Sequence, residues 1–115
     1  MTIHTYDLET YPNVFTATFK HFDTSAFQVF EWSDRRNDIP MLLQFMTIPG
    51  VEYVGFNNVG FDYPVLHWLK ENYMHGRTTV LDLFNKANSI INTPFDQRYS
   101  NVVPEYKRYV PQIDL

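Results

Sequence analysis

The alternation of apolar and polar positions near the start of the chain predicts three consecutive strands. They span residues 3–8, 14–22 and 26–32. In the second, Phe15, Ala17 and Phe19 fall on one face and polar residues on the other, which is typical of a half-buried strand. Because the links between the strands are short, they predict an antiparallel meander.

Most of the aromatic residues in this region also follow strand spacing, and we expect most of them to lie in the core. They are Phe15, Phe19, Phe22, Phe27, Phe30 and Trp32.

The rest of the chain predicts helices on either side of a fourth strand. Asp38 is suited to cap a helix that has Pro40 in its first turn and runs to about Met46. The later elements are a strand at 51–56, helices at 64–73 and 80–91, a loop at 93–104 and a strand at 109–115. The order β-β-β-α-β-α-α-β predicts an α/β domain of two or three layers. The chain stops inside the last strand, so either this is an edge strand or the chain is shorter than its fold.

Composition narrows the class of protein. With 115 residues, the chain fits one domain, residues 1–115, and the absence of cysteine excludes disulfides and thiolate metal sites. No segment approaches the roughly 20 apolar residues of a membrane span, so we expect no membrane partner and a cytoplasmic location. The net charge of −4 argues against a protein that coats duplex nucleic acid, but not against an enzyme that acts on it.

Two carboxylates lie near the end of the first strand. Asp7 and Glu9 are two residues apart, so their side chains share a face, with Cα atoms about 7 Å apart. Such a pair repels unless a cation or hydrogen-bond donors lie nearby, and oxygen ligands suit Mg²⁺ or Mn²⁺. The alternative is an ordinary solvated surface pair.

The stretch at 54–64 runs from a short strand through an Asn- and Gly-rich turn into a helix. It carries a third carboxylate, Asp62. Placed beside Asp7 and Glu9, it would complete a site for two ions, one generating hydroxide and one stabilising a leaving oxygen. The alternatives are that Asp62 only caps the helix and that residues 57–60 form only a turn.

Together these segments resemble a known family. Tyr6-Asp7-Leu8-Glu9-Thr10 is similar to the first motif, Asp-X-Glu, of the DEDD 3′–5′ exonucleases. The segment from Gly55 to Asp62 resembles the second motif, Asn-X-X-X-Phe-Asp, of family B DNA polymerase proofreading domains, and phage-type polymerases are the most similar. Residues 63–66 resemble the start of the family's next helix, and residues 110–115 resemble a later strand. The resemblance covers the whole chain and implies a ribonuclease H-like fold. This is a mixed β-sheet with flanking helices, whose central first strand carries Asp7 and Glu9.

The resemblance also implies roles for particular residues. Asp7, Glu9 and Asp62 would be the catalytic residues and the ligands of a two-metal Mg²⁺ or Mn²⁺ site. Asn57 and Phe61 would position and stack the 3′-terminal nucleotides of single-stranded DNA.

One part of the family pattern is missing. The third motif, Tyr-X-X-X-Asp, has no counterpart, because neither Tyr99 nor Tyr106 is followed by Asp at the required offset. The family pattern gives Asp114 no catalytic role. The chain therefore corresponds to the N-terminal portion of the family's domain, and the fold is expected to be incomplete at its C-terminal end.

Three hypotheses follow from this pattern. The first is a metal-dependent 3′–5′ exonuclease-like domain that acts on single-stranded DNA ends and, alone, binds metal weakly and cleaves poorly. The second is an inactive stand-alone phage protein in the host bacterial cytoplasm that binds a partner protein, such as a component of a host defence system. The third is a fragment of a longer polymerase or nuclease.

Other candidates have simpler interpretations. The four histidines are widely spaced and are expected at the surface or partly buried. The pairs Arg35-Arg36 and Lys107-Arg108 could touch phosphates, but a solvated face is the simpler interpretation. Ser89 and Ser100 lack the context of a catalytic nucleophile.

Overall fold

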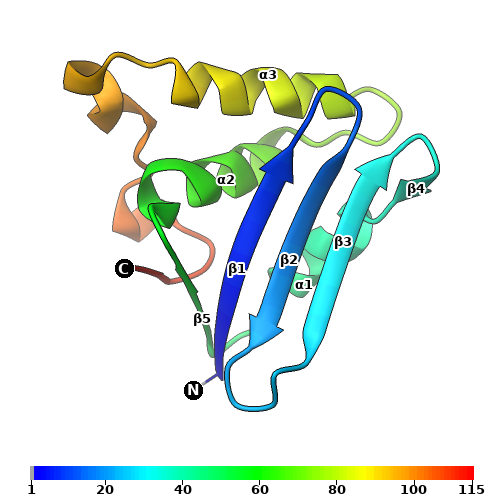
Figure 1. The fold of residues 1–115 in the computed structure, drawn as a ribbon, viewed down its shortest axis with the longest axis vertical. Helices are drawn as coiled ribbons and strands as arrows, with labels where there is room; N and C mark the ends of the chain where they lie inside the picture. The colour runs from blue at the N-terminus through cyan, green and yellow to red at the C-terminus, as the bar shows by residue number, and fades with distance from the viewer. Residues whose placement is uncertain (1) are drawn as a thin grey trace.

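One mixed six-stranded sheet organises the chain (Figure 1). The structure is a computed structural model and describes residues 2–115. The strands are β1 (Thr2–Thr10), β2 (Phe15–His21), β3 (Phe27–Ser33), β4 (Arg36–Asn37), β5 (Val51–Gly55) and β6 (Gln112–Asp114), in the spatial order β4-β3-β2-β1-β5-β6. Neighbours from β1 to β4 are antiparallel, whereas β5 pairs parallel to β1 and β6 parallel to β5. The predicted meander and mixed sheet are confirmed.

The helices leave one face of the sheet open. They are α1 (Ile39–Phe45), α2 (Tyr63–Asn72) and α3 (Val80–Ile91), with a π-helical turn η1 (Asn58–Asp62) before α2 and 3-10 turns η2 (Phe95–Asn101) and η3 (Glu105–Lys107). In Figure 1, α1 and α2 lie behind the sheet and α3 crosses above it, while no helix of the described residues covers the front. None of these helices is long and apolar enough to span a bilayer.

The core lies between the sheet and the helices behind it. Tyr6 and Leu8 of β1 point into it, and in register they face Phe19 and Ala17 of β2. From the helical side, the fully buried Leu66 of α2 and other apolar residues complete the same cluster. This alternation explains why Asp7 and Glu9, between and beyond the two buried residues of β1, emerge on the open face.

The aromatic residues of the meander divide between the two faces. Phe15, Phe19, Phe30 and Trp32 are buried, as expected. Phe22 and Phe27 are the exceptions, with 66% and 67% of their surface exposed. Phe27 pairs in register with Lys20 on the outward face, and Phe22 follows β2 at the same parity as Lys20, so both point away from the helices.

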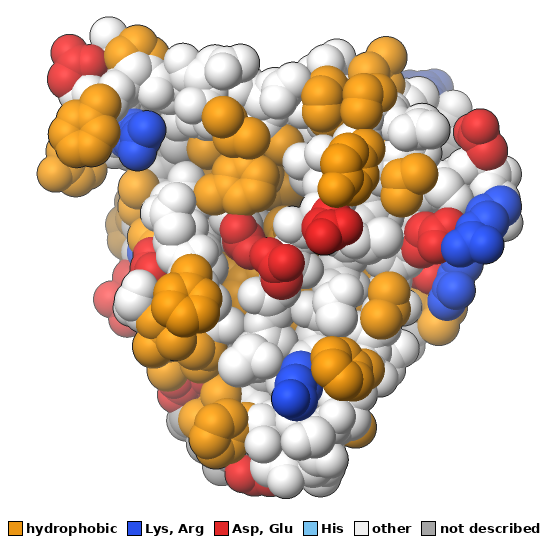
Figure 2. Space-filling view, in the orientation of Figure 1, with side chains coloured by type: hydrophobic (Ala, Val, Ile, Leu, Met, Phe, Trp, Pro, Cys, Tyr) orange, Lys and Arg blue, Asp and Glu red, His pale blue; other side chains and the backbone are white. Residues whose placement is uncertain are grey.

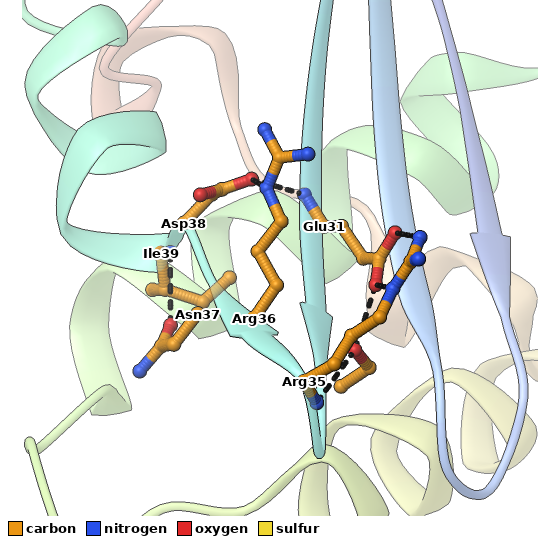
Figure 3. A network of polar contacts seen from close by, with 7 residues as sticks. Glu31, Arg35, Arg36, Asn37, Asp38 and Ile39 are labelled. Carbon is orange, nitrogen blue, oxygen red and sulfur yellow. Dashed lines mark hydrogen bonds and ion pairs between the residues drawn. The ribbon is translucent and has the colours of Figure 1, made fainter.

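A polar network closes the β3–β4 hairpin onto the start of α1 (Figure 3). Arg35 forms a two-pronged ion pair with Glu31, and the Arg35 and Ser33 side chains hold the pKa of Glu31 down to about 2. Arg36 pairs with Asp38 at 2.6 Å, and the Asp38 carboxylate also accepts the backbone N–H of Glu31. Both arginines are therefore engaged within the hairpin.

Asp38 occupies the N-cap position of α1, but its side chain does not cap the helix. Its carboxylate is turned toward β3 and Arg36, as described above. The Asn37 side chain instead accepts the N–H of Ile39 at 3.0 Å. The predicted position is right and the predicted role is wrong, because the ion pair competes for the same oxygens.

The C-terminal half departs from the prediction in two places. The loop expected at 93–104 contains the 3-10 turn η2, and the last strand is only Gln112–Asp114. That strand lies at the edge of the sheet, in agreement with the interpretation of the last segment as an edge strand. Helix α3 has the predicted bounds, and a reciprocal capping box between Thr79 and Asp82 fixes its start.

Candidate functional site

The residues singled out from the sequence meet at the carboxyl ends of the three mutually parallel strands. β1 carries Asp7 and Glu9 near its end, β5 leads into η1, and β6 ends at Asp114. Ligand sites of α/β sheets commonly lie beyond this edge, since the loops that leave the strands converge there. The topology therefore brings together segments that are about 50 residues or more apart in sequence.

The turn between β5 and η1 is held by Asp114. Its carboxylate accepts the backbone N–H of Asn57 at 2.9 Å and that of Val59 at 3.3 Å. Asn57 has φ of 54°, a left-handed conformation that asparagine tolerates better than most residues. The family pattern gives Asp114 no catalytic role, and its recruitment as a metal ligand is a less favoured alternative; the structure shows that it shapes the turn.

Gly55 lets this turn approach β1 closely. A Cβ atom at this position would lie 3.2 Å from the Cβ of Asn58 and 3.4 Å from the Tyr6 carbonyl oxygen. Both contacts are tight for a real Cβ, so a larger residue would push η1 away from the strand that carries Asp7.

A buried amide network joins the turn to two strands. The side-chain oxygen of Gln112 accepts the hydroxyl of Tyr6 at 2.6 Å and the side-chain amide of Asn58 at 2.9 Å. Asn58 is fully buried, and its own side-chain oxygen has no partner among the described residues. Sequence reasoning missed Asn58 and Gln112 as positioning residues, because only the fold places them in contact.

Asp62 points toward β1 and does not cap α2. Its backbone is helical, with φ of −60° and ψ of −46°, and its side chain makes no capping hydrogen bond, so the capping alternative is wrong. Only 7% of the residue is exposed, and the backbone of Leu8 hydrogen-bonds to its carboxylate.

The environment of Asp62 disfavours its charged form. Burial raises the pKa of Asp62 to about 7, and the nearby charges of Asp7 and Asp114 act in the same direction. The Leu8 hydrogen bond opposes them without cancelling them. Asp7 and Asp62 are thus close enough to repel each other, which is the electrostatic condition for a cation site.

The fit of this site to a metal ion rests on the Asp7–Asp62 pair. Carboxylate oxygens are the donors that Mg²⁺ and Mn²⁺ prefer, and a cation between Asp7 and Asp62 would relieve their repulsion. Glu9 is exposed on the same face of β1. Within residues 2–115 no three acidic or histidine side chains are gathered closely enough to share an ion. Figure 2 shows acidic side chains in the middle of the open face, over the upper half of β1.

Asn57 and Phe61, the expected substrate-binding residues, line one pocket together. Its volume is about 340 Å³, and Ile90 and Ile91 at the end of α3 and residues of η2 form its other walls. Phe61 is half-buried and packs against the core. Phe61 directly precedes Asp62 in the sequence, but Asp7, Glu9 and Asp62 do not line this pocket.

Comparisons of the chain with protein-family models, with curated proteins and with solved structures find no match.

Proposed function

We propose that the chain is a ribonuclease H-like, DEDD-type 3′–5′ exonuclease-like domain that binds divalent metal and single-stranded DNA ends. The observation that carries the proposal is the pairing of Asp7 with Asp62. Two segments that resemble the exonuclease motifs are brought together so that the charge of Asp7 helps to raise the pKa of the buried Asp62. A helix cap or a solvated surface pair needs no such arrangement.

The sheet topology supports the same proposal. An antiparallel meander of β1, β2 and β3 continues through β5 and β6, both parallel to β1. This is the mixed sheet expected of a ribonuclease H-like domain, with its first strand in the interior of the sheet carrying the first pair of carboxylates.

The residues at this edge would have separate roles in an exonuclease. Asp7 and Asp62 would hold Mg²⁺ or Mn²⁺, and Glu9 would contribute from the open face. The bound metal would supply an activated water and charge stabilisation at a phosphodiester. Asn57 and Phe61 would hold the terminal nucleotides, the aromatic ring by stacking.

Cleavage by this chain is expected to be weak. The family's third motif supplies a further carboxylate and a tyrosine that orients water, and the sequence contains no such Tyr-X-X-X-Asp. The proposal therefore separates binding of metal and DNA, which the residues present can support, from efficient turnover.

Cleavage of a 5′-labelled single-stranded oligonucleotide with Mg²⁺ or Mn²⁺ tests the proposal. We expect slow removal of nucleotides from the 3′ end that is abolished by Asp7→Asn and by Asp62→Asn. Asp34→Asn, an exposed carboxylate at the β3–β4 turn, is the matched control. Calorimetric titration with Mn²⁺ should show weaker metal binding by Asp7→Asn and Asp62→Asn, and unchanged binding by Asp34→Asn. Cleavage that survives Asp7→Asn would remove the assignment.

A second candidate function is favoured by the open face of the sheet. A hollow of about 260 Å³ beside Asp7 is flanked by the exposed apolar residues Phe27, Phe56 and Leu115. Phe56 is 80% exposed, which is unusual for so large an apolar side chain. Under this proposal the chain binds a partner protein, such as a component of a host defence system, through this face. A stoichiometric complex that survives Asp7→Ala and Asp62→Ala but not Phe56→Ser would support it.

A further inference from the structure

We infer that η2 forms the second wall of a groove for single-stranded DNA, with Arg98 and Tyr99 binding the strand opposite Asn57 and Phe61. The choice of DNA as ligand rests on the proposed function. The role of η2 does not come from the exonuclease motifs, because residues 95–101 lie outside them. It comes from the shape and chemistry of the pocket that η2 closes.

Three separate segments build this groove. The turn at Asn57–Phe61 forms one side, the end of α3 forms the floor with Ile90 and Ile91, and η2 forms the other side. In Figure 1, η2 follows the end of α3 at the upper left of the molecule, and η1 lies below them at the start of α2. A volume of about 340 Å³ lies within the range of small-ligand pockets and is sufficient for a nucleobase with part of its sugar.

The two η2 side chains have the chemistry that a nucleotide requires. Tyr99 is 87% exposed although it lines the groove, so its ring has a free face for stacking on a base. Arg98 lies with its guanidinium 5.1 Å from the Phe95 ring centre and makes no ion pair among residues 2–115. It is the only charged residue among the described lining residues. An uncompensated cation beside an aromatic wall matches a phosphate that follows a stacked base.

Hydrogen bonds hold η2 in place against α3. The side-chain amide of Asn101 donates to the hydroxyl of Thr93 at 2.9 Å, and that hydroxyl donates to the Ser89 carbonyl oxygen at 2.6 Å. The backbone N–H of Val102 closes the end of η2 onto the Tyr99 carbonyl oxygen. The wall is therefore attached to a capped helix, and little ordering is needed when a ligand enters.

The groove should prefer single strands to duplex. Stacking on Tyr99 and Phe61 requires an unpaired base, and the net charge of −4 gives no broad electrostatic attraction to duplex phosphates. With one groove cation, the affinity should fall only gently with salt, with a slope of about 0.7 in the logarithmic plot.

The chain contains its own control for this inference. Tyr106 and Lys107 of η3 repeat the same chemistry, with Tyr106 82% exposed and the Lys107 ammonium 5.8 Å from the Tyr106 ring centre. They do not line the groove between η1 and η2. A generic aromatic–cation surface effect would act at both places, whereas a built groove would act only at η2.

Fluorescence anisotropy with a 5′-fluorescein oligodeoxythymidine of about eight nucleotides, in EDTA, tests the inference without metal or cleavage. We expect Tyr99→Leu to weaken binding at least about fivefold, because it removes the ring on which a base stacks. Arg98→Gln should weaken binding to a similar extent, because it removes the cation that binds a phosphate. Tyr99→Phe should bind as the wild type does, because stacking needs the ring and not the hydroxyl. Tyr106→Leu and Lys107→Gln should leave the affinity unchanged.

Several results would overturn the inference. They are a wild-type chain that does not bind the oligonucleotide, equal losses in the η2 and η3 variants, and η2 variants that bind normally while circular dichroism shows them folded. The result is separable from that of the proposed function, which is tested by metal-dependent cleavage in the wild type and its loss in Asp7→Asn and Asp62→Asn. Photocrosslinking of a 4-thiothymidine oligonucleotide should label the peptide that contains Tyr99, and labelling confined to η3 would contradict the inference.

Discussion

The carboxylate of Asp114 accepts the backbone N–H of Asn57 across a sequence separation of 57 residues. The same carboxylate also accepts the N–H of Val59, so one side chain of the edge strand satisfies two donors of the turn. In this way β6 determines the conformation of the segment that carries Asn57, Phe61 and Asp62.

Replacing Asp114 should therefore loosen this turn. We expect Asp114→Ala to lower the free energy of unfolding by about 1–3 kcal/mol, since it leaves two backbone donors without their charged acceptor. Urea denaturation measures this change. Asp34→Ala, which removes an exposed carboxylate, should change the stability by less than about 0.5 kcal/mol. Equal losses in the two variants would show that Asp114 does not hold the turn.

Gly60→Ala should affect binding more than stability. A Cβ atom at Gly60 would lie 2.5 Å from the side-chain oxygen of Asn57, which must then move. Because that oxygen belongs to an exposed side chain, the loss of stability should stay below about 1 kcal/mol. The affinity for the labelled oligonucleotide should fall to that of Asn57→Ala. Normal binding by Gly60→Ala would exclude Asn57 as a DNA contact.

Tyr63→Phe should destabilise the attachment of the C-terminal segment. The fully buried Tyr63 hydroxyl accepts the N–H of Tyr109 at 2.7 Å and lies 3.0 Å from Nδ1 of His67. Removing it leaves a backbone donor unpaired, at a cost of about 1–3 kcal/mol in thermal unfolding. The comparison is Tyr73→Phe, whose hydroxyl bonds only to side chains. A larger loss in Tyr73→Phe would contradict this prediction.

The stability of the chain should fall between about pH 4 and pH 7 through Asp62. Its pKa is raised from 3.8 to about 7 on folding, so the folded state binds the proton more tightly than the unfolded chain does. This contribution is complete below the unfolded pKa and is lost as the pH rises through the folded pKa. We expect an effect on the order of 2 kcal/mol, roughly half the full linkage value, because water that reaches the site screens it.

The pH profile has an internal control and a metal test. Asp62→Asn has no carboxyl group at this position, so it should not lose this contribution to stability between pH 4 and pH 7. At pH 8, Mg²⁺ or Mn²⁺ should raise the melting temperature of the wild type, and the increase should be smaller at pH 5, where Asp62 holds a proton. Identical pH profiles of the wild type and Asp62→Asn would show that ionisation of Asp62 does not change the free energy of unfolding.

The local parts of the fold could be predicted from the sequence. Alternation in β2 and the stripe of α3 reflect which faces are buried, and both signals lie within a few residues of chain. The expectation that most of the aromatic residues of the meander lie in the core is confirmed, but spacing alone did not single out Phe22 and Phe27 as the exposed ones. The role of Asp38 was misassigned because the competing partner, Arg36, becomes available only in the folded hairpin.

The candidate site was only partly predictable for the same reason. Asp7, Glu9, Asn57, Phe61 and Asp62 stand in recognisable local contexts, but the residues that position them do not. Gln112 meets Tyr6 across 106 residues of sequence, and no local pattern marks such a partner. The 3-10 turn η2 was hidden because the prolines on either side of it, Pro94 and Pro104, also suit an irregular loop.

The dependence of the η1 turn on β6 has a consequence for the order of folding. The β1–β2–β3 meander closes short loops, whereas the Asp114 contacts close a long one, and long loops form later. We therefore expect the meander to be formed early and the Asn57 and Val59 amides to gain protection in the last step. Quenched-flow hydrogen exchange would resolve the two phases, and simultaneous protection would refute this order. If this order holds, the chain passes through an intermediate in which the sheet and core are formed but the turn at Asn57 and Val59 is not.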